Sequence, residues 1–220
     1  QRQMCIRDSY GIGMLLKKKW KLAIFNPLLI SIALTIAALS CLHINYDTYN
    51  EGAKYLSYLL TPATVCLAIP LYEQLELLKH NWKAIVLGIL SGVLASLGSI
   101  LGMAVLFGMS HEEYVTFLPK SITTAIGMGV SEKLGGFVPI SVAAIIITGV
   151  LGNIFAELIF RIFRIREPIA RGVALGTASH AIGTAKAMEL GEVEGAMSSL
   201  SIVVAGLVTV GGASVFSLIR

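Results

Sequence analysis

Four long stretches of the chain lack any Asp, Glu, Lys or Arg residue. They are Leu22–Tyr46, Ala84–Ser110, Leu134–Ala156 and Gly195–Ile219. A helix needs about 20 apolar residues to cross the hydrocarbon core of a bilayer, and each stretch is longer than that. Charged residues make up 14% of the 220 residues, whereas soluble domains have about 25%. The sequence therefore predicts an all-α polytopic membrane protein, with no room for a separate soluble domain.

The charge and the cysteine content argue against several classes of function. The net charge is +4, and the basic residues lie in short loops between apolar stretches, which is typical of topology signals rather than of a nucleic-acid surface. Cys5, Cys41 and Cys66 are too few and too scattered for a disulfide framework or a metal site. Neither a nucleophile–base–acid set nor a phosphate-binding glycine loop is present. We therefore expect neither an enzyme nor an ATP-driven pump, and no metal or cofactor.

The first nine residues, Gln1–Ser9, are polar and charged, and the chain becomes apolar abruptly at Tyr10. They lack the pattern of a signal peptide and resemble translated sequencing adapter. A short disordered head is the alternative interpretation. We therefore expect residues 1–9 to be a non-native or disordered head and residues 10–220 to be a single transmembrane domain with a truncated first helix.

Loop charges predict the topology, because short loops rich in Lys and Arg stay in the cytoplasm. Basic residues cluster at 17–21, 79–83 and 161–171, and acidic ones at 47–51, 112–113 and 189–194. The expected crossings, alternately outward and inward, are Pro27–Ile44, Lys54–Leu78, Ala84–Phe107, Phe137–Phe160, Arg171–Met188 and Ala196–Ile219. With the truncated first helix this gives about seven transmembrane segments. Tyr114–Val130 is predicted to be a re-entrant segment or hairpin. The alternative is that this segment crosses the membrane, which would upset the alternation of outward and inward crossings.

The six crossings form two three-segment sets of opposite orientation, and the middle segment of each is interrupted. The interruptions are TPATVCLAIP (Thr61–Pro70) and GTASHAIGTA (Gly176–Ala185). Inverted repeats with broken central helices are typical of secondary transporters, whose site lies where the breaks meet. The pattern therefore predicts a transport site formed by these two segments.

Several strings resemble the LrgB/CidB family of bacterial membrane proteins, whose relatives include the LrgB-like part of the plastid glycolate/glycerate transporter. The strings are NPLLIS (Asn26–Ser31), LLTPATVCLAIPLYEQL (Leu59–Leu75), LPKSITTAIGM (Leu118–Met128), ARGVALGTASHAIGTAKAMEL (Ala170–Leu190) and EGAMSSLSIVVAG (Glu194–Gly206). One position departs from the family pattern, because Ala125 stands where the family usually carries Pro.

The resemblance implies two functions. One is a carrier of small monocarboxylates such as pyruvate, glycolate or glycerate. The other is a holin/antiholin-like regulator of murein hydrolase export and cell lysis. Both imply a multi-pass protein of the bacterial cytoplasmic membrane that acts with a small LrgA/CidA-like partner; homo-oligomerisation stays open. The hydroxyl clusters and broken helices favour the carrier, because a pore former needs neither.

Polar side chains in the interrupted segments are the candidate substrate ligands. They are Thr61, Thr64, Lys120, Ser121, Thr123, Thr177, Ser179, His180 and Thr184. We expect the hydroxyls and free backbone N–H groups to bind a carboxylate, with Lys120 as the counter-charge and His180 sensing or moving a proton. The alternatives are that Lys120 snorkels to the interface and that His180 bridges helices. The predicted helix-breaking residues are Pro62, Pro70, Pro119, Gly176 and Gly183.

Other residues have simpler interpretations. Glu157 and Arg161 are expected to form an ion pair along one helix, and Arg164, Arg166 and Arg171 to be orientation signals. Glycine and serine at close spacing predict helix packing; these residues are Gly88, Gly92, Ser96, Gly98, Gly102 and Gly172.

Overall fold

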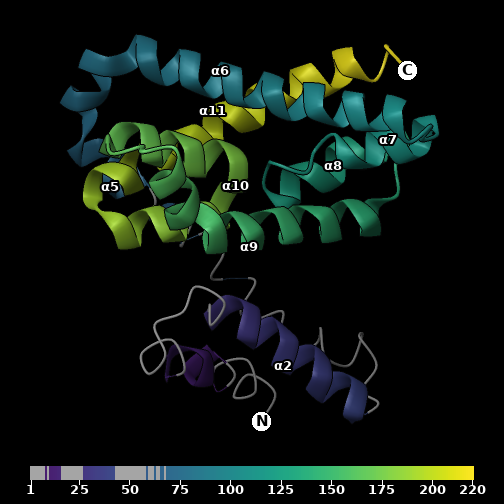
Figure 1. Cartoon of the computed structure of the whole chain (residues 1–220), viewed down its shortest axis with the longest axis horizontal. Coiled ribbons are helices and arrows are strands. Elements are labelled where there is room, and N and C mark those ends of the chain that lie inside the picture. The colour runs from purple at the N-terminus through teal and green to yellow at the C-terminus, as the bar shows by residue number, and fades with distance from the viewer. Residues whose placement is uncertain are drawn as a thin grey trace. The chain divides into compact units, whose positions relative to one another are not determined.

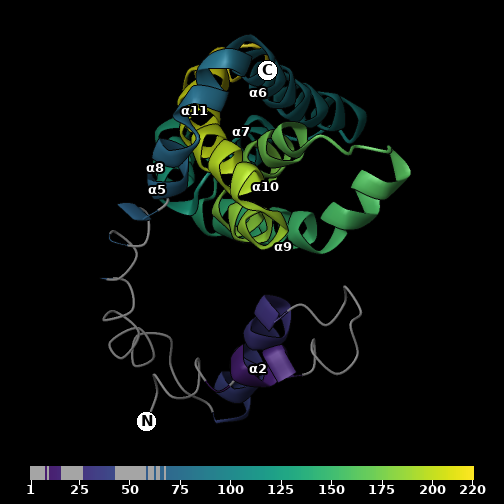
Figure 2. The same cartoon turned by 90° about the vertical axis from the view of Figure 1, so that its left-hand side faces the viewer.

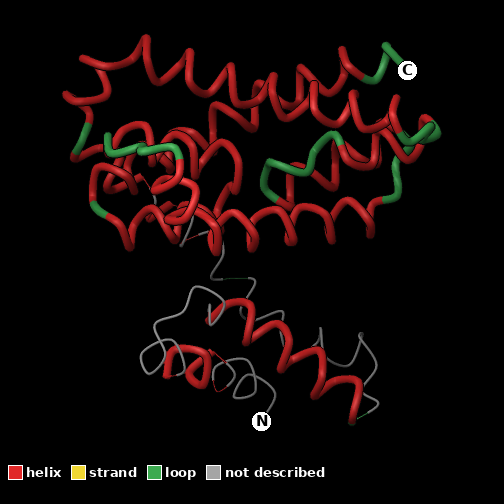
Figure 3. The backbone as a smooth tube through the Cα atoms, in the orientation of Figure 1, coloured by secondary structure: helices red, strands yellow, loops and turns green. Residues whose placement is uncertain are grey.

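The computed structural model describes residues 8, 10–15, 27–42, 58, 62, 65–66 and 68–220. The chain divides into two units, Gln1–Cys66 and Leu67–Arg220. The described part is helical apart from short turns and loops and contains no strand (Figure 3). The all-α prediction is therefore confirmed.

The described part of the first unit contains the helix α2 (Pro27–Cys41). This helix carries no charged residue and lies within the predicted crossing Pro27–Ile44. Residues 10–15 are also helical. Thr61 and Thr64, two of the predicted substrate ligands, lie outside the described residues.

Three helices of the second unit are long and apolar enough to cross a membrane. They are α6 (Leu75–Leu106), α9 (Val138–Ile162) and α11 (Glu192–Phe216). In Figure 1, α6 and α9 lie on opposite sides of this unit. The expectation of a polytopic membrane protein is therefore confirmed.

The beginning of α6 differs from the prediction of a loop at Lys79 and Lys83. The single residue Gln74 separates a short helix, α5 (Ala68–Glu73), from α6, which begins at Leu75. The intervening stretch from Leu75 to Lys83 contains neither Gly nor Pro, and Leu, Glu and Lys favour helix. The lysines therefore extend the membrane-crossing helix by two turns instead of interrupting it.

A helical hairpin connects α6 to α9. Its helices, α7 (His111–Phe117) and α8 (Thr124–Leu134), are each too short to cross a bilayer. Ser110 and Glu113 form a capping box that starts α7, and Pro119 lies in the turn between the helices. The Thr116 hydroxyl accepts a hydrogen bond from the backbone N–H of Phe137 (2.8 Å), which ties the returning chain to α7. The hairpin expected over this region is therefore present.

A second hairpin lies within α10 (Pro168–Leu190), where His180 has non-helical dihedral angles (φ 42°, ψ −137°). Beyond this break the chain turns back on itself. The contact of Gly183 with the backbone of Leu175, two helical turns earlier in the sequence, shows this reversal. Gly176 on the first arm contacts the Ser198 carbonyl, and Thr184 on the returning arm lies 2.7 Å from the Ser198 hydroxyl. Both arms therefore lie along the same part of α11.

The ends of α10 consequently meet at one end of the unit. Arg171 and Leu190 line the same small cavity, and the Arg171 guanidinium lies 4.0 Å from the Glu194 carboxylate. The prediction that Arg171–Met188 crosses the membrane is therefore wrong. So is the placement of residues 189–194 on the outer side, because they lie beside Arg171. The last helix accordingly starts at the arginine-bearing end, opposite to the predicted direction.

The core of the second unit forms along one face of α6. Its buried residues recur every three or four positions, the period of a single helical face; they are Ile85, Ile89, Val93, Leu97, Ile100 and Ala104. Buried residues of α7, α10 and α11 complete this cluster, and Figure 2 shows α10 and α11 side by side. The α7–α8 hairpin and the α10 hairpin enter the unit from opposite ends (Figure 1).

Candidate functional site

A cavity of about 900 Å³ lies among α6, α9, the first arm of α10 and the α7–α8 turn. It extends along α6 from Asn81 to Ser99, a length of about 27 Å at the rise of an α-helix. Its polar lining comes from all four elements: Asn81, Ser96, Ser99, Lys120, Ser121, Thr148, Glu167, Thr177 and Ser179. The cavity thus collects residues from distant parts of the sequence between the two hairpins.

Lys120 provides a cation in this cavity. Its Nζ donates to the hydroxyls of Ser96 and Ser121, both at 3.2 Å, and these two hydroxyls lie 3.0 Å apart. Within the described ranges, no carboxylate lies at ion-pair distance from Lys120. The ammonium group therefore has neutral partners here and can attract an anion.

Thr177 lines the same cavity from the opposite hairpin. The side chain is 94% buried, and its Oγ1 has no hydrogen-bond partner in the part of the chain that the structure describes. Buried polar atoms are nearly always hydrogen-bonded, because leaving one unpaired costs about 1–3 kcal/mol. A ligand oxygen that reached this hydroxyl would supply the missing partner.

Glycines allow the hairpin arm to approach its neighbours closely. A Cβ on Gly92 of α6 would lie 2.8 Å from Thr177 Cγ2, and one on Gly152 of α9 would overlap the Ser179 hydroxyl. Gly88 likewise faces Val173. The packing expected for Gly88 and Gly92 is thus observed. A Cβ on Gly98 or Gly102 would meet no described atom within 4 Å, so the packing expected of those two does not occur there.

His180 and Thr184, two predicted substrate ligands, do not line the cavity. The His180 ring is buried, and its Nε2 lies 3.0 Å from the Ile145 carbonyl oxygen of α9. Thr184 donates to the His180 carbonyl oxygen at the break (3.1 Å). In this geometry both residues hold the bend of α10, as the helix-bridging alternative for His180 expects.

The remaining predicted residues fall in several places. Thr123 precedes α8, is half-buried and lies outside the cavity lining. Pro62 is an exposed helical residue of the first unit, and Pro70 lies in the first turn of α5, where proline is tolerated. Gly176 and Gly183 keep helical dihedral angles, so the prediction that they break the helix is wrong. Their lack of a Cβ serves close packing instead.

Sequence reasoning missed part of the lining. Ser96 was interpreted as a packing residue, whereas it binds Lys120; Ser99, Thr148 and Gly152 were not singled out. The available signal was the spacing of Gly88, Gly92, Ser96 and Ser99, which places small residues on one face of α6. Among the described residues, no group of three His, Cys, Asp or Glu side chains is placed to hold a metal ion.

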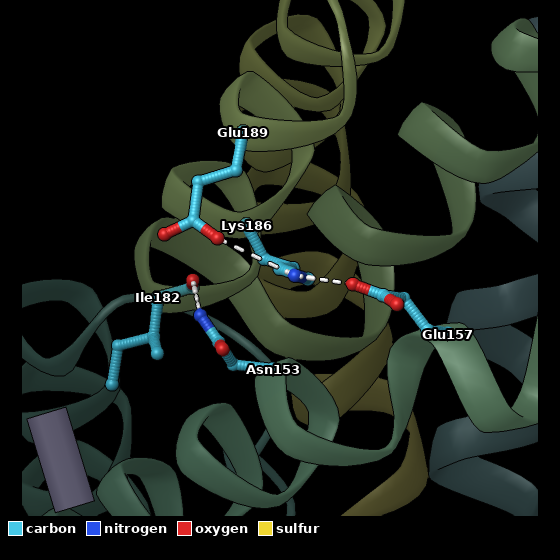
Figure 4. A network of polar contacts seen from close by, with 5 residues as sticks. All are labelled: Asn153, Glu157, Ile182, Lys186 and Glu189. Carbon is cyan, nitrogen blue, oxygen red and sulfur yellow. Dashed lines mark hydrogen bonds and ion pairs between the residues drawn. The ribbon is translucent and has the colours of Figure 1, made fainter. Parts of the chain in front are cut away.

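A polar network fixes the returning arm of α10 to α9 (Figure 4). Lys186 lies 2.6 Å from the Glu157 carboxylate and 3.3 Å from that of Glu189, and Asn153 donates to the Ile182 carbonyl (3.0 Å). The predicted ion pair between Glu157 and Arg161 is therefore wrong, because the fold brings Lys186 to Glu157.

Comparison with known proteins identifies the family. The model of the LrgB-like family matches residues 9–219. The chain belongs to the LrgB-like family. Proteins named "Antiholin-like protein LrgB" from Bacillus mycoides (strain KBAB4) and Bacillus cereus (strain B4264) are each 40% identical to it over 203 residues, covering 92% of this chain and 88% of the relative. No solved structure matches the chain. The resemblance stated from the sequence motifs is thus confirmed.

Proposed function

We propose that this LrgB-like protein is a carrier or facilitator for a small monocarboxylate in the bacterial cytoplasmic membrane. The observation that supports this most is that one cavity is lined by a cation and by a threonine whose hydroxyl has no protein partner. Lys120 reaches the cavity from the α7–α8 turn, and Thr177, whose buried hydroxyl is unpaired among the described residues, lines it from α10. A carboxylate needs this combination of positive charge and hydrogen-bond donors.

Between its polar residues the wall of the cavity is apolar, because Ala, Ile, Val and Gly residues form much of it. Such a lining favours a small organic acid over a hydrated inorganic ion. The two hairpins are the elements whose movement would alternate access, since the turn of the first and the first arm of the second line the cavity and each hairpin enters from its own end. A small LrgA/CidA-like protein is the proposed partner.

Antiholin-like regulation is the second candidate, because the relatives at 40% identity bear that name. In this function the protein would modulate murein hydrolase export and envelope permeability together with its partner. The cavity would then have no transported substrate, and Lys120 and Thr177 would matter only for folding.

Uptake into proteoliposomes distinguishes the two candidates. Labelled pyruvate, glycolate, glycerate and a neutral sugar are offered to the whole protein, with and without the small partner. The carrier predicts saturable uptake of one acid, a loss of uptake in Lys120→Met, and an increase of about tenfold in KM for Thr177→Val, as expected for one lost hydrogen bond to a charged ligand.

Lys133→Gln is the matched control, because Lys133 is an exposed lysine of the same hairpin outside the cavity. This variant should transport like the unchanged protein. Leakage of the sugar and all acids alike, unaffected by Lys120→Met, would exclude the carrier and favour the permeability regulator.

A further inference from the structure

A second cavity lies where α9 ends and both ends of α10 meet. It has a volume of about 370 Å³ and is lined by Glu157, Phe160, Arg161, Arg164, Ile165, Arg166, Arg171 and Leu190. Four of these eight residues are arginines, and the only acid is Glu157, whose carboxylate already lies 2.6 Å from Lys186. The cavity therefore has an excess of positive charge.

The arginines differ in how they are held. Arg171 is fixed, because its Nε donates to the Ile165 carbonyl (2.9 Å), its guanidinium lies 4.0 Å from Glu194, and it stacks 5.7 Å from the centre of the Phe160 ring. The other three are exposed and have no acidic partner among the described residues. They are Arg161, Arg164 and Arg166.

The backbone at Arg164 supports a role for its side chain. Arg164 has φ 54°, and the N–H of Ile165 bonds to the Phe160 carbonyl (2.8 Å), which closes α9 in a C-terminal capping turn. Glycine usually occupies this left-handed position, and a residue with a Cβ there costs about 1 kcal/mol. An arginine at this position thus carries a local conformational cost.

Apolar side chains next to the arginines indicate which anion fits. Ile159 and Ile162 on the last turn of α9 and its C-cap residue Phe163 are 43%, 63% and 72% exposed, and α9 is one of the candidate membrane helices. Phe160, Ile165 and Leu190 continue the apolar surface into the cavity. Arginine binds phosphate oxygens with two parallel hydrogen bonds, and basic pockets between membrane helices bind anionic headgroups.

We propose that this arginine cavity binds the phosphate of an anionic phospholipid headgroup, with the acyl chains against the exposed apolar residues of α9. The site is separate from the carboxylate cavity and does not depend on the transport proposal. Because the cavity is framed by Arg171 at the start of α10 and Leu190 at its end, a bound lipid would hold the base of the hairpin whose first arm lines the central cavity.

Thermal unfolding of the whole protein in a neutral detergent tests the proposal. Phosphatidylglycerol should raise the unfolding midpoint in a saturable way by about 3 °C, and phosphatidylcholine should raise it much less. The double variant Arg161→Gln, Arg166→Gln should bind phosphatidylglycerol about tenfold more weakly, because two charge-assisted contacts are lost. Lys79→Gln, Lys83→Gln removes the same charge from the first turns of α6, outside the cavity, and should bind as before.

Arg164→Gly separates binding from folding. Glycine relieves the left-handed position, so the lipid-free protein should unfold at a higher temperature, while phosphatidylglycerol should bind more weakly. Equal loss of lipid binding in the Lys79, Lys83 double variant would overturn the proposal in favour of diffuse charge attraction. An unchanged lipid response in the Arg161, Arg166 double variant would also overturn it. A midpoint rise of the same size with inorganic phosphate, lost in the same variant, would overturn the lipid source and point to a soluble phosphate.

Discussion

The α7–α8 hairpin and the α10 hairpin enter the same unit from opposite ends, but different interactions hold them. Polar side chains fix the first: the Thr116 hydroxyl accepts from Phe137, and Ser141 donates to the Thr116 carbonyl (2.7 Å). Glycine contacts fix the second, because Gly172 and Gly176 press directly on the backbone of α11. Hydrogen bonds hold the base of the first hairpin, whereas close glycine contacts with α11 hold the first arm of the second, in addition to the polar contacts of its bend and returning arm.

The first hairpin was predicted from the loop charges on either side of it, whereas the second was mistaken for a crossing. Pro119 and the capping residues of α7 are local signals that any reader of the sequence can find. The α10 turn at His180 has no proline, and its helical pattern continues on both sides. Close packing of two arms on a third helix is a tertiary property, and a stripe of glycines does not show which helix it will meet.

Gly176→Val is the strongest test of the glycine contacts. A Cβ at Gly176 would overlap the Ser198 carbonyl oxygen of α11, and a backbone atom cannot move aside as a flexible side chain can. We expect a loss of about 3 kcal/mol in the free energy of unfolding, seen as little monodisperse protein in size-exclusion chromatography after expression.

Gly98→Val is the matched control, because a Cβ at Gly98 of α6 meets no described atom within 4 Å. It should leave expression and the unfolding temperature nearly unchanged. Equal behaviour of the two variants would contradict the conclusion that glycine packing holds the α10 hairpin.

His180 tests the turn itself. His180→Val places a β-branched residue at φ 42° and removes the hydrogen bond to the Ile145 carbonyl. His180→Gly removes the same hydrogen bond but suits the positive φ. We expect Val to be about 2 kcal/mol less stable than Gly, measured by thermal unfolding in detergent. A Gly variant no more stable than the Val variant would show that α10 continues as a straight helix.

The features that the sequence predicted are those with a local signal, and the features that it did not predict depend on tertiary packing. The apolar stretches predicted the spanning helices α6, α9 and α11, because burial in lipid leaves a signal in composition alone. The cavity residues Lys120, Ser121, Thr177 and Ser179 were singled out, because polar groups are rare in membrane segments. Ser96 and Thr148 were not, because a single hydroxyl on an apolar helix fits equally well at a helix interface or at a ligand site.

Thr116→Val tests the hydrogen bonds of the α7–α8 hairpin. The substitution nearly conserves volume but leaves the Phe137 N–H without its acceptor. We expect a loss of about 1–2 kcal/mol, less than for Gly176→Val. Thr148→Val changes the same chemistry on α9, where the half-buried Thr148 hydroxyl lines the cavity, and should cost little stability. A Thr116→Val protein as stable as the Thr148→Val protein would mean that the base of this hairpin does not depend on the bond.

The smallest expected effect concerns the ion pair that joins the returning arm of α10 to α9. Lys186 and Glu157 lie 2.6 Å apart, but the Glu157 side chain is 58% exposed, so solvent screens most of the attraction. A double-mutant cycle with Glu157→Gln and Lys186→Gln should give a coupling energy of about 0.5 kcal/mol. It is measured from unfolding midpoints at low salt and should shrink as salt is added.

A second double-mutant cycle, with Glu157→Gln and Arg161→Gln, tests whether Glu157 pairs with Arg161 of the same helix instead of with Lys186. Spacing along α9 favours a pair between these two residues. In the structure, however, Glu157 pairs with Lys186, and Arg161 lines the arginine cavity. The coupling in this cycle should therefore be close to zero. A larger coupling for Arg161 than for Lys186 would mean that the returning arm does not lie against α9, and that the α10 hairpin is more open than its glycine contacts require.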